Sequence, residues 1–158
     1  MMRLGQQSEA EELAEEALRL AEVDGDKRAL ARACNALGIL ARSQGDLGLS
    51  AEHLSRSLSL AEALNDPAAR VAALNNLALV WQAAGATENA IGLTESALTL
   101  CRAHGDRHRE AALLNNLADL LHANGQTEEA MAYLKPAVAI FAEIGGSESL
   151  MSLSLIHI

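Results

Sequence analysis

The chain of 158 residues contains few of the residue types that build catalytic centres, aromatic cores or disulfide frameworks. Only three residues are aromatic, only two are proline and only two are cysteine, and no CxxC pair occurs. The P-loop pattern GxxxxGK[ST], the zinc-protease pattern HExxH and the hydrolase pattern GxSxG are all missing. We therefore expect neither enzyme activity nor a cofactor.

Charge and hydropathy exclude further classes of protein. The net charge is −9, and the twelve basic residues are scattered, which argues against direct nucleic-acid binding. No stretch approaches the ~20 apolar residues that span a bilayer, and no apolar segment follows the first residues as in a signal peptide. We therefore expect a cytoplasmic protein without a membrane partner, in which Cys34 and Cys101 are buried free thiols.

One group of residues has the chemistry of a metal site. Cys101, His104 and His108 lie close together in the sequence, but Gly105 and Asp106 separate the histidines, so the two imidazoles do not share a helix face. No fourth ligand has the spacing of a zinc site, so solvated loop histidines are the favoured interpretation and we predict no metal.

What the sequence does contain is a repeat of 40 residues. Residues 30–45 read LARACNALGILARSQG, residues 70–85 read RVAALNNLALVWQAAG, and residues 110–125 read EAALLNNLADLLHANG. Glycine recurs at 5, 45, 85 and 125, without any insertion between the copies. A fixed period of this length is typical of a repeat protein.

Each repeat is expected to hold two helices. The first ends at the recurring glycine, which can adopt the left-handed conformation after a helix. Start signals are Thr87 and Thr127, each followed by Glu, and Asp66 followed by Pro67, with Asp26 and Asp106 at the position of Asp66. The pattern predicts seven helices, near 6–23, 27–43, 47–64, 67–83, 87–103, 108–123 and 127–143.

The repeat also predicts the domain organisation. Residues 1–146 form one helical repeat domain, made of a half repeat 1–26 and the repeats 27–66, 67–106 and 107–146. The pattern fails after Gly145, so residues 147–158 are expected to be an irregular tail. The last six residues, LSLIHI, are similar to a translated transposase end sequence used in preparing sequencing libraries, and we interpret them as an artefact on a truncated gene fragment.

The repeat resembles the tetratricopeptide repeat (TPR). Its Leu-Gly pair is matched by Leu37-Gly38, Leu77-Ala78 and Leu117-Ala118, its early alanine in the second helix by Ala10, Ala90 and Ala130, and its second large residue by Trp81. The resemblance implies an all-α solenoid, a right-handed superhelix of antiparallel helix pairs with about three and a half repeats. The 40-residue period is similar to that of LuxR-type (STAND) bacterial signalling ATPases and of kinesin light chains.

This resemblance implies a protein- or peptide-binding module, part of a larger bacterial signalling or transcription-regulatory protein. A small-molecule sensor arm and a structural spacer are the alternatives. We also expect self-association through the uncapped repeat ends.

Helical projection of the first helix of each repeat separates a buried side from a polar side. In the central copy Leu74, Leu77, Ala78 and Trp81 lie on the predicted core side, together with Ala73, Val80 and Ala84. The resemblance places the opposite side along a concave groove. We expect that groove to bind a protein or peptide ligand through Arg32, Asn35, Ile39, Arg42, Asn75, Asn76, Leu79, Gln82, Asn115, Asn116, Asp119 and His122.

The recurrent asparagines permit two interpretations. Asparagine is a poor residue inside a helix, yet it occurs five times at equivalent positions. The amides either bond to one another between neighbouring helices or hold the main chain of an extended peptide, since an amide offers both a donor and an acceptor.

Overall fold

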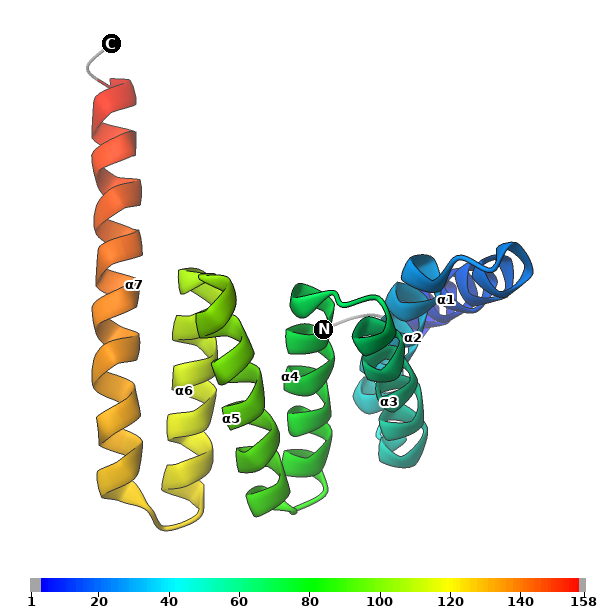
Figure 1. Ribbon diagram of the computed structural model, residues 1–158, viewed down its shortest axis with the longest axis horizontal. Helices are drawn as coiled ribbons and strands as arrows, with labels where there is room; N and C mark the ends of the chain where they lie inside the picture. The colour runs from blue at the N-terminus through cyan, green and yellow to red at the C-terminus, as the bar shows by residue number, and fades with distance from the viewer. Residues whose placement is uncertain (1–3, 157–158) are drawn as a thin grey trace.

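The computed structural model describes the backbone of residues 4–156 and the side chains of residues 5–146. Seven α-helices form this part of the chain and follow one another in a stack (Figure 1). The helices are α1 (Leu4–Asp24), α2 (Lys27–Ser43), α3 (Leu47–Ala63), α4 (Pro67–Ala83), α5 (Thr87–His104), α6 (Arg107–Ala123) and α7 (Thr127–Ile156). The predicted all-α repeat fold is confirmed.

The helix starts follow from the side chains in front of them. Asp26, Asp66 and Asp106 each accept a hydrogen bond at 3.1 Å from the backbone N–H three residues later, so these carboxylates cap α2, α4 and α6. Asp46 caps α3 in the same way, which the sequence analysis did not anticipate. Thr87 is the first residue of α5 rather than its cap, because Ala86 holds the cap position without a side-chain hydrogen bond.

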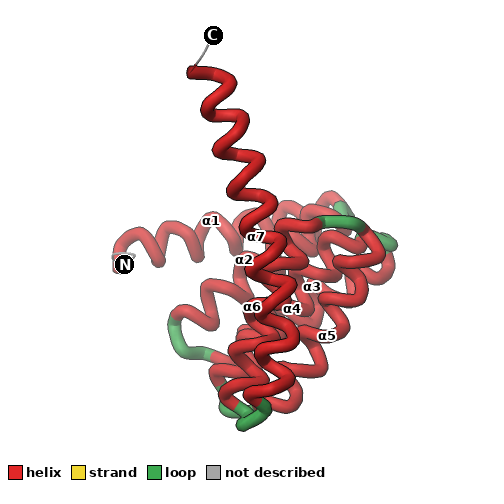
Figure 2. The backbone as a smooth tube through the Cα atoms, turned by 90° about the vertical axis from the view of Figure 1, so that its left-hand side faces the viewer, coloured by secondary structure: helices red, strands yellow, loops and turns green. Residues whose placement is uncertain are grey.

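Glycine and asparagine stop the helices where the repeat requires a turn. Gly45, Gly85 and Gly125 adopt φ values near +82°, which side chains with a Cβ rarely tolerate. The turns between repeats use the same conformation at Gly25, Asn65 and Gly105. Each helix consequently reverses direction and packs antiparallel against the next one (Figures 1 and 2).

The core lies between the paired helices. Leu77 is 5% exposed, as predicted, and Leu37 and Leu117 at the equivalent positions of α2 and α6 are at most 6% exposed. Besides its neighbours along the chain, α2 also contacts α4 directly. The first helices of successive repeats, α2, α4 and α6, therefore share one continuous face.

Small residues allow α2 and α3 to approach each other closely. A Cβ built on Gly38 would lie 2.5 Å from Cγ of Leu54, which is fully buried. Ser50 and Ser57 on α3 donate buried hydrogen bonds to the carbonyl oxygens of Gly38 and Ala31. These bonds satisfy the hydroxyl groups inside the core and fix how α3 lies along α2.

Two expectations for side chains and for the C-terminal region were wrong. Trp81 and Ala84, predicted on the buried side of α4, are exposed, the indole to 38%, because they lie in the last turn of α4 and at its C-cap, close to the edge of the core. The irregular tail is absent as far as Ile156, since α7 continues without a break (Figure 1). Residues 157–158 lie outside the described part.

The extension of α7 has a physical reason. At the three earlier repeat turns a residue with positive φ is followed by an aspartate that caps the next helix. At the equivalent place Gly145 does not adopt positive φ, and Gly146 has no side chain to cap a new helix. The helical hydrogen-bond pattern therefore continues.

Candidate functional site

The five predicted asparagines lie on one face of the stack. Asn35 belongs to α2, Asn75 and Asn76 to α4, and Asn115 and Asn116 to α6, and all five are half-buried. We call these five residues the asparagine face. Their helices are neighbours in the stack, so the face runs across the repeats rather than along one helix.

Two hydrogen bonds join asparagines of successive repeats. Nδ2 of Asn76 donates to Oδ1 of Asn35 at 3.0 Å, and Nδ2 of Asn116 donates to Oδ1 of Asn75 at 3.3 Å. The first bond connects α2 with α4, and the second connects α4 with α6. The bracing interpretation of the asparagines therefore has direct support.

These bonds use only part of each amide. The NH₂ groups of Asn35 and Asn75 and the Oδ1 atoms of Asn76 and Asn116 make no hydrogen bond within the described residues. Among the described residues, the side-chain amide of Asn115 has no hydrogen-bond partner. The asparagine face thus presents donors and acceptors that a ligand can engage.

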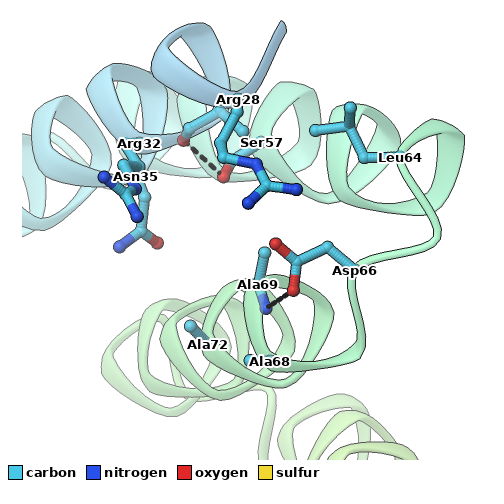
Figure 3. Close-up of a pocket in the computed structure, with 10 residues that line it drawn as sticks. Arg28, Arg32, Asn35, Ser57, Leu64, Asp66, Ala68, Ala69 and Ala72 are labelled. Carbon is cyan, nitrogen blue, oxygen red and sulfur yellow. Dashed lines mark hydrogen bonds between the residues drawn. The ribbon is translucent and has the colours of Figure 1, made fainter.

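A cleft of about 210 Å³ opens between α2 and α4 (Figure 3). Arg28, Arg32 and Asn35 line it from α2, and alanines line it from α4. Asp66 lies across from Arg28 in Figure 3, but its Oδ1 is occupied as the cap of α4. Neither guanidinium has a hydrogen bond or an ion pair with another described residue, so two cations face this cleft in a chain with net charge −9.

The equivalent cleft between α4 and α6 is smaller, about 140 Å³. Asn75, Asn76 and Asn116 line it, together with Arg109. Nη1 of Arg109 donates to the carbonyl oxygen of Ala68 at 3.2 Å, so its side chain bridges α6 and α4. Ala69 occupies the corresponding position in the preceding repeat, which leaves the α2–α4 cleft more open.

The remaining predicted site residues line neither of these clefts. Ile39 is 37% exposed, Asp119 is exposed, and Leu79 is half-buried at the same repeat position. In the last helical turns Arg42 is half-buried with an unpartnered buried Nε, Gln82 is exposed, and His122 lies 3.4 Å from the Thr127 hydroxyl. The structure therefore places Arg32 and Asn35 at the α2–α4 cleft and Asn75, Asn76 and Asn116 at the α4–α6 cleft, and the rest of the predicted set at neither.

Sequence reasoning missed two residues of the clefts. Arg28 precedes Arg32 by one helical turn and so shares its side of α2, a spacing that was visible in the sequence. Arg109 had no such signal, because its role depends on a carbonyl group 41 residues earlier in the chain.

Cys34 and Cys101 are buried free thiols. Burial raises the pKa of both cysteines, and the Cys101 thiol donates to the carbonyl oxygen of Asp106. Within residues 5–146 no three His, Cys, Asp or Glu side chains are arranged to hold a metal ion. None of the helices described here is sufficiently long and apolar to cross a membrane.

Comparison with known families identifies the repeat. The model of the tetratricopeptide repeat matches residues 70–143, which span α4 to α7 and include four of the five asparagines. Over these residues the chain matches the tetratricopeptide repeat family. Tetratricopeptide repeats form non-catalytic scaffolds that mediate protein–protein interaction. None of the curated proteins matches the chain.

Solved structures show the same fold over most of the chain. BtubC (BKLC) from P. vanneervenii is 27% identical, with a TM-score of 0.75 over 89% of this chain and 57% of its own. A putative kinesin light chain with TPR-like repeats from Podosopora anserina is 24% identical, with a TM-score of 0.74 over 88% and 69% of the two chains. Aspartyl phosphate phosphatase F from Bacillus subtilis is 15% identical, with a TM-score of 0.84 over 90% and 37%. The chain thus spans little more than half the length of the first of these structures.

Proposed function

We propose that this chain binds an extended peptide across α2, α4 and α6, with the ligand main chain on the asparagine face. One observation carries the proposal: each asparagine pair is held by an interhelical bond and still leaves one donor group and one acceptor group unused. A peptide unit offers the matching acceptor and donor.

The spacing of the helices suits such a ligand. Packed helices lie ~10 Å apart, and an extended chain advances ~3.3 Å per residue. Successive amide pairs would therefore meet about every third residue of the ligand. The resulting contacts with the ligand depend on main-chain groups and not on its sequence.

The charges on the same surface favour a particular ligand composition. Arg28 and Arg32 face the α2–α4 cleft without a partner among the described side chains, which favours an acidic ligand residue there. Asp119 on α6 favours a basic residue toward the other end. A small-molecule sensor site in the α2–α4 cleft has less support, because the volume of this cleft, about 210 Å³, is below the ~300–1,000 Å³ usual for ligand pockets.

We also propose that the module acts within a larger regulatory protein, as the resemblance to LuxR-type signalling ATPases implies. Each of the similar structures described above is longer than the part that this chain covers. Sequencing the complete reading frame tests this proposal. An ATPase domain beside the repeats is expected, and a reading frame without any second domain would contradict it.

Peptide selection followed by calorimetry tests the binding function. Twelve-residue peptides selected from a random library on the full chain should contain an acidic residue. The double variant Arg28→Ala/Arg32→Ala should weaken their binding about two- to thirty-fold, since each exposed ion pair contributes ~0.2–1 kcal/mol. Its stability should not change, because neither arginine has a partner among the described residues.

A matched control shows whether a loss of affinity is specific to the arginines of the α2–α4 cleft. Arg19→Ala removes an exposed arginine of α1 that lines neither cleft, and should leave peptide affinity unchanged. Equal affinity of wild type and the double arginine variant would show that peptides bind elsewhere.

A further inference from the structure

The interhelical asparagine bonds follow a rule that repeats along the chain. The acceptor is the first asparagine of one helix, Asn35 or Asn75, and the donor lies 41 residues later, at Asn76 or Asn116. In α2 the position equivalent to Asn76 and Asn116 is occupied by Ala36, which has no side-chain amide to donate. Both bonds therefore run in the same direction through the stack.

We propose that these bonds orient the asparagine amides for the ligand: Asn35 and Asn75 present donors, Asn76 and Asn116 present acceptors, and the peptide is bound in one chain direction. This inference rests on the proposed function and specifies how the same face recognises a main chain.

The physical reason is the rotational freedom of an amide. An isolated asparagine amide turns about its last torsion angle, which has a broad, roughly two-fold preference, and can offer either its NH₂ or its oxygen to a ligand. Once Oδ1 of Asn35 accepts from Asn76, the NH₂ of Asn35 is directed away from that bond. The side chain is then already ordered before the ligand binds. Binding does not have to supply the free energy for ordering it, and this favours affinity.

The two asparagine pairs keep polar atoms that the interhelical hydrogen bonds do not use, and these atoms lie near the clefts. Asn35 lines the α2–α4 cleft, and Asn75, Asn76 and Asn116 line the α4–α6 cleft, so the unused halves lie beside open space. A purely structural amide in a folded protein generally has its remaining polar atoms satisfied by the protein or by water. The asparagine face offers its free NH₂ groups and its free Oδ1 atoms in a fixed order. A peptide bound in the reverse direction would place its own N–H groups against the NH₂ groups of Asn35 and Asn75.

Aspartate substitutions separate the two halves of each pair. Asn35→Asp and Asn75→Asp keep the acceptor oxygen of the interhelical bond but remove the NH₂ that would face the ligand. Asn76→Asp and Asn116→Asp remove the donor and place two acceptors against each other. Asn89→Asp is the matched control, because it adds the same charge to an exposed asparagine of α5, outside the asparagine face and outside both interhelical bonds.

The expected result is a separation of stability from affinity. In urea titrations Asn35→Asp and Asn75→Asp should unfold at the wild-type midpoint, whereas Asn76→Asp and Asn116→Asp should unfold at a lower one. In calorimetry with a selected twelve-residue peptide, Asn35→Asp should weaken binding about tenfold, and Asn89→Asp should leave it unchanged.

A change in the ligand tests the acceptor half. Replacing one peptide amide by an ester removes a single ligand N–H. At the position that faces Asn76 this change should weaken binding to wild type about tenfold and have less than a twofold effect on the Asn76→Ala variant. Esters with equal effects on both proteins would contradict the acceptor role of Asn76.

The remaining outcomes distinguish this inference from the proposed function. If Asn35→Asp and Asn76→Asp are equally destabilised while peptide binding responds to both, the orientation is wrong and the binding face is right. If peptide binding ignores every substitution on the asparagine face, both proposals are wrong, whatever the stabilities.

Discussion

The contact between Gly38 and Leu54 predicts that one added methyl group destabilises the protein. Gly38 lies inside α2, where alanine would ordinarily favour the helix by ~1 kcal/mol over glycine. A Cβ at this position would lie 2.5 and 2.7 Å from Cγ and Cδ2 of Leu54, closer than such atoms approach in proteins. Leu54 is fully buried, so its side chain can yield only by repacking against other core residues.

The net effect follows from two opposing contributions. Overpacking a core costs ~1–3 kcal/mol, and the short contact places this site toward the upper end. After subtraction of the helix-propensity gain, Gly38→Ala should lower the free energy of unfolding by about 1–2 kcal/mol. Gly92→Ala is the control, because Gly92 is exposed inside α5 and its added Cβ would meet nothing within 4 Å. That variant should be more stable by ~0.5–1 kcal/mol.

Urea titration followed by circular dichroism measures both effects. The double variant Gly38→Ala/Leu54→Thr reproduces the pair found one repeat later, Ala78 with Thr94. It should be less destabilised than the sum of its single changes, because residues in contact are not additive. If Gly38→Ala stabilises the protein as Gly92→Ala does, then α2 and α3 do not pack as closely as the structure shows.

Four further changes test the core, the ion pairs, the thiols and the clefts. Leu77→Ala should cost ~2–5 kcal/mol, because Leu77 is 5% exposed, whereas half-buried Leu79→Ala should cost much less; equal losses in urea would contradict the assigned faces. Glu110→Ala breaks the pairs with Arg102 and Arg107 and should cost about 1–2 kcal/mol by thermal unfolding, since both arginines are half-exposed and regain water. Burial raises the pKa of Cys34 and Cys101, so iodoacetamide should alkylate them at pH 8 only after denaturation; rapid labelling of the native protein would refute their burial. Ala69→Arg copies Arg109 into the more open cleft and should reduce peptide affinity without loss of stability, whereas unchanged affinity would show that the α2–α4 cleft does not bind the ligand.

The fold was predictable because its signals are local and recur. The positive-φ glycines and the aspartates at 26, 66 and 106 act through residues within one turn, so the helix boundaries could be placed closely. The exposure of Trp81 depends on where the core ends along α4, and the helical periodicity of the sequence does not indicate that point. The continuation of α7 depends on the absence of a cap at Gly146, which the repeat pattern alone did not reveal.

The candidate site could be predicted only as a face. The 40-residue period indicated that the asparagines lie together, but it left open whether their amides bond to one another or to a ligand. Which atoms pair depends on the distance between α2, α4 and α6, and the structure shows two bonds across that distance. The role of Arg109 likewise depends on its bond with Ala68 on another helix.

Nuclear magnetic resonance of the asparagine side chains tests the central claim most directly. The chain has eight asparagines, and Asn65, Asn89 and Asn124 lie outside the asparagine face as internal controls. When a selected peptide is titrated into ¹⁵N-labelled protein, the NH₂ signals of Asn35, Asn75, Asn76, Asn115 and Asn116 should shift, and the three controls should not. Shifts at Asn89 without shifts on the asparagine face would place the binding surface elsewhere and contradict the proposed function.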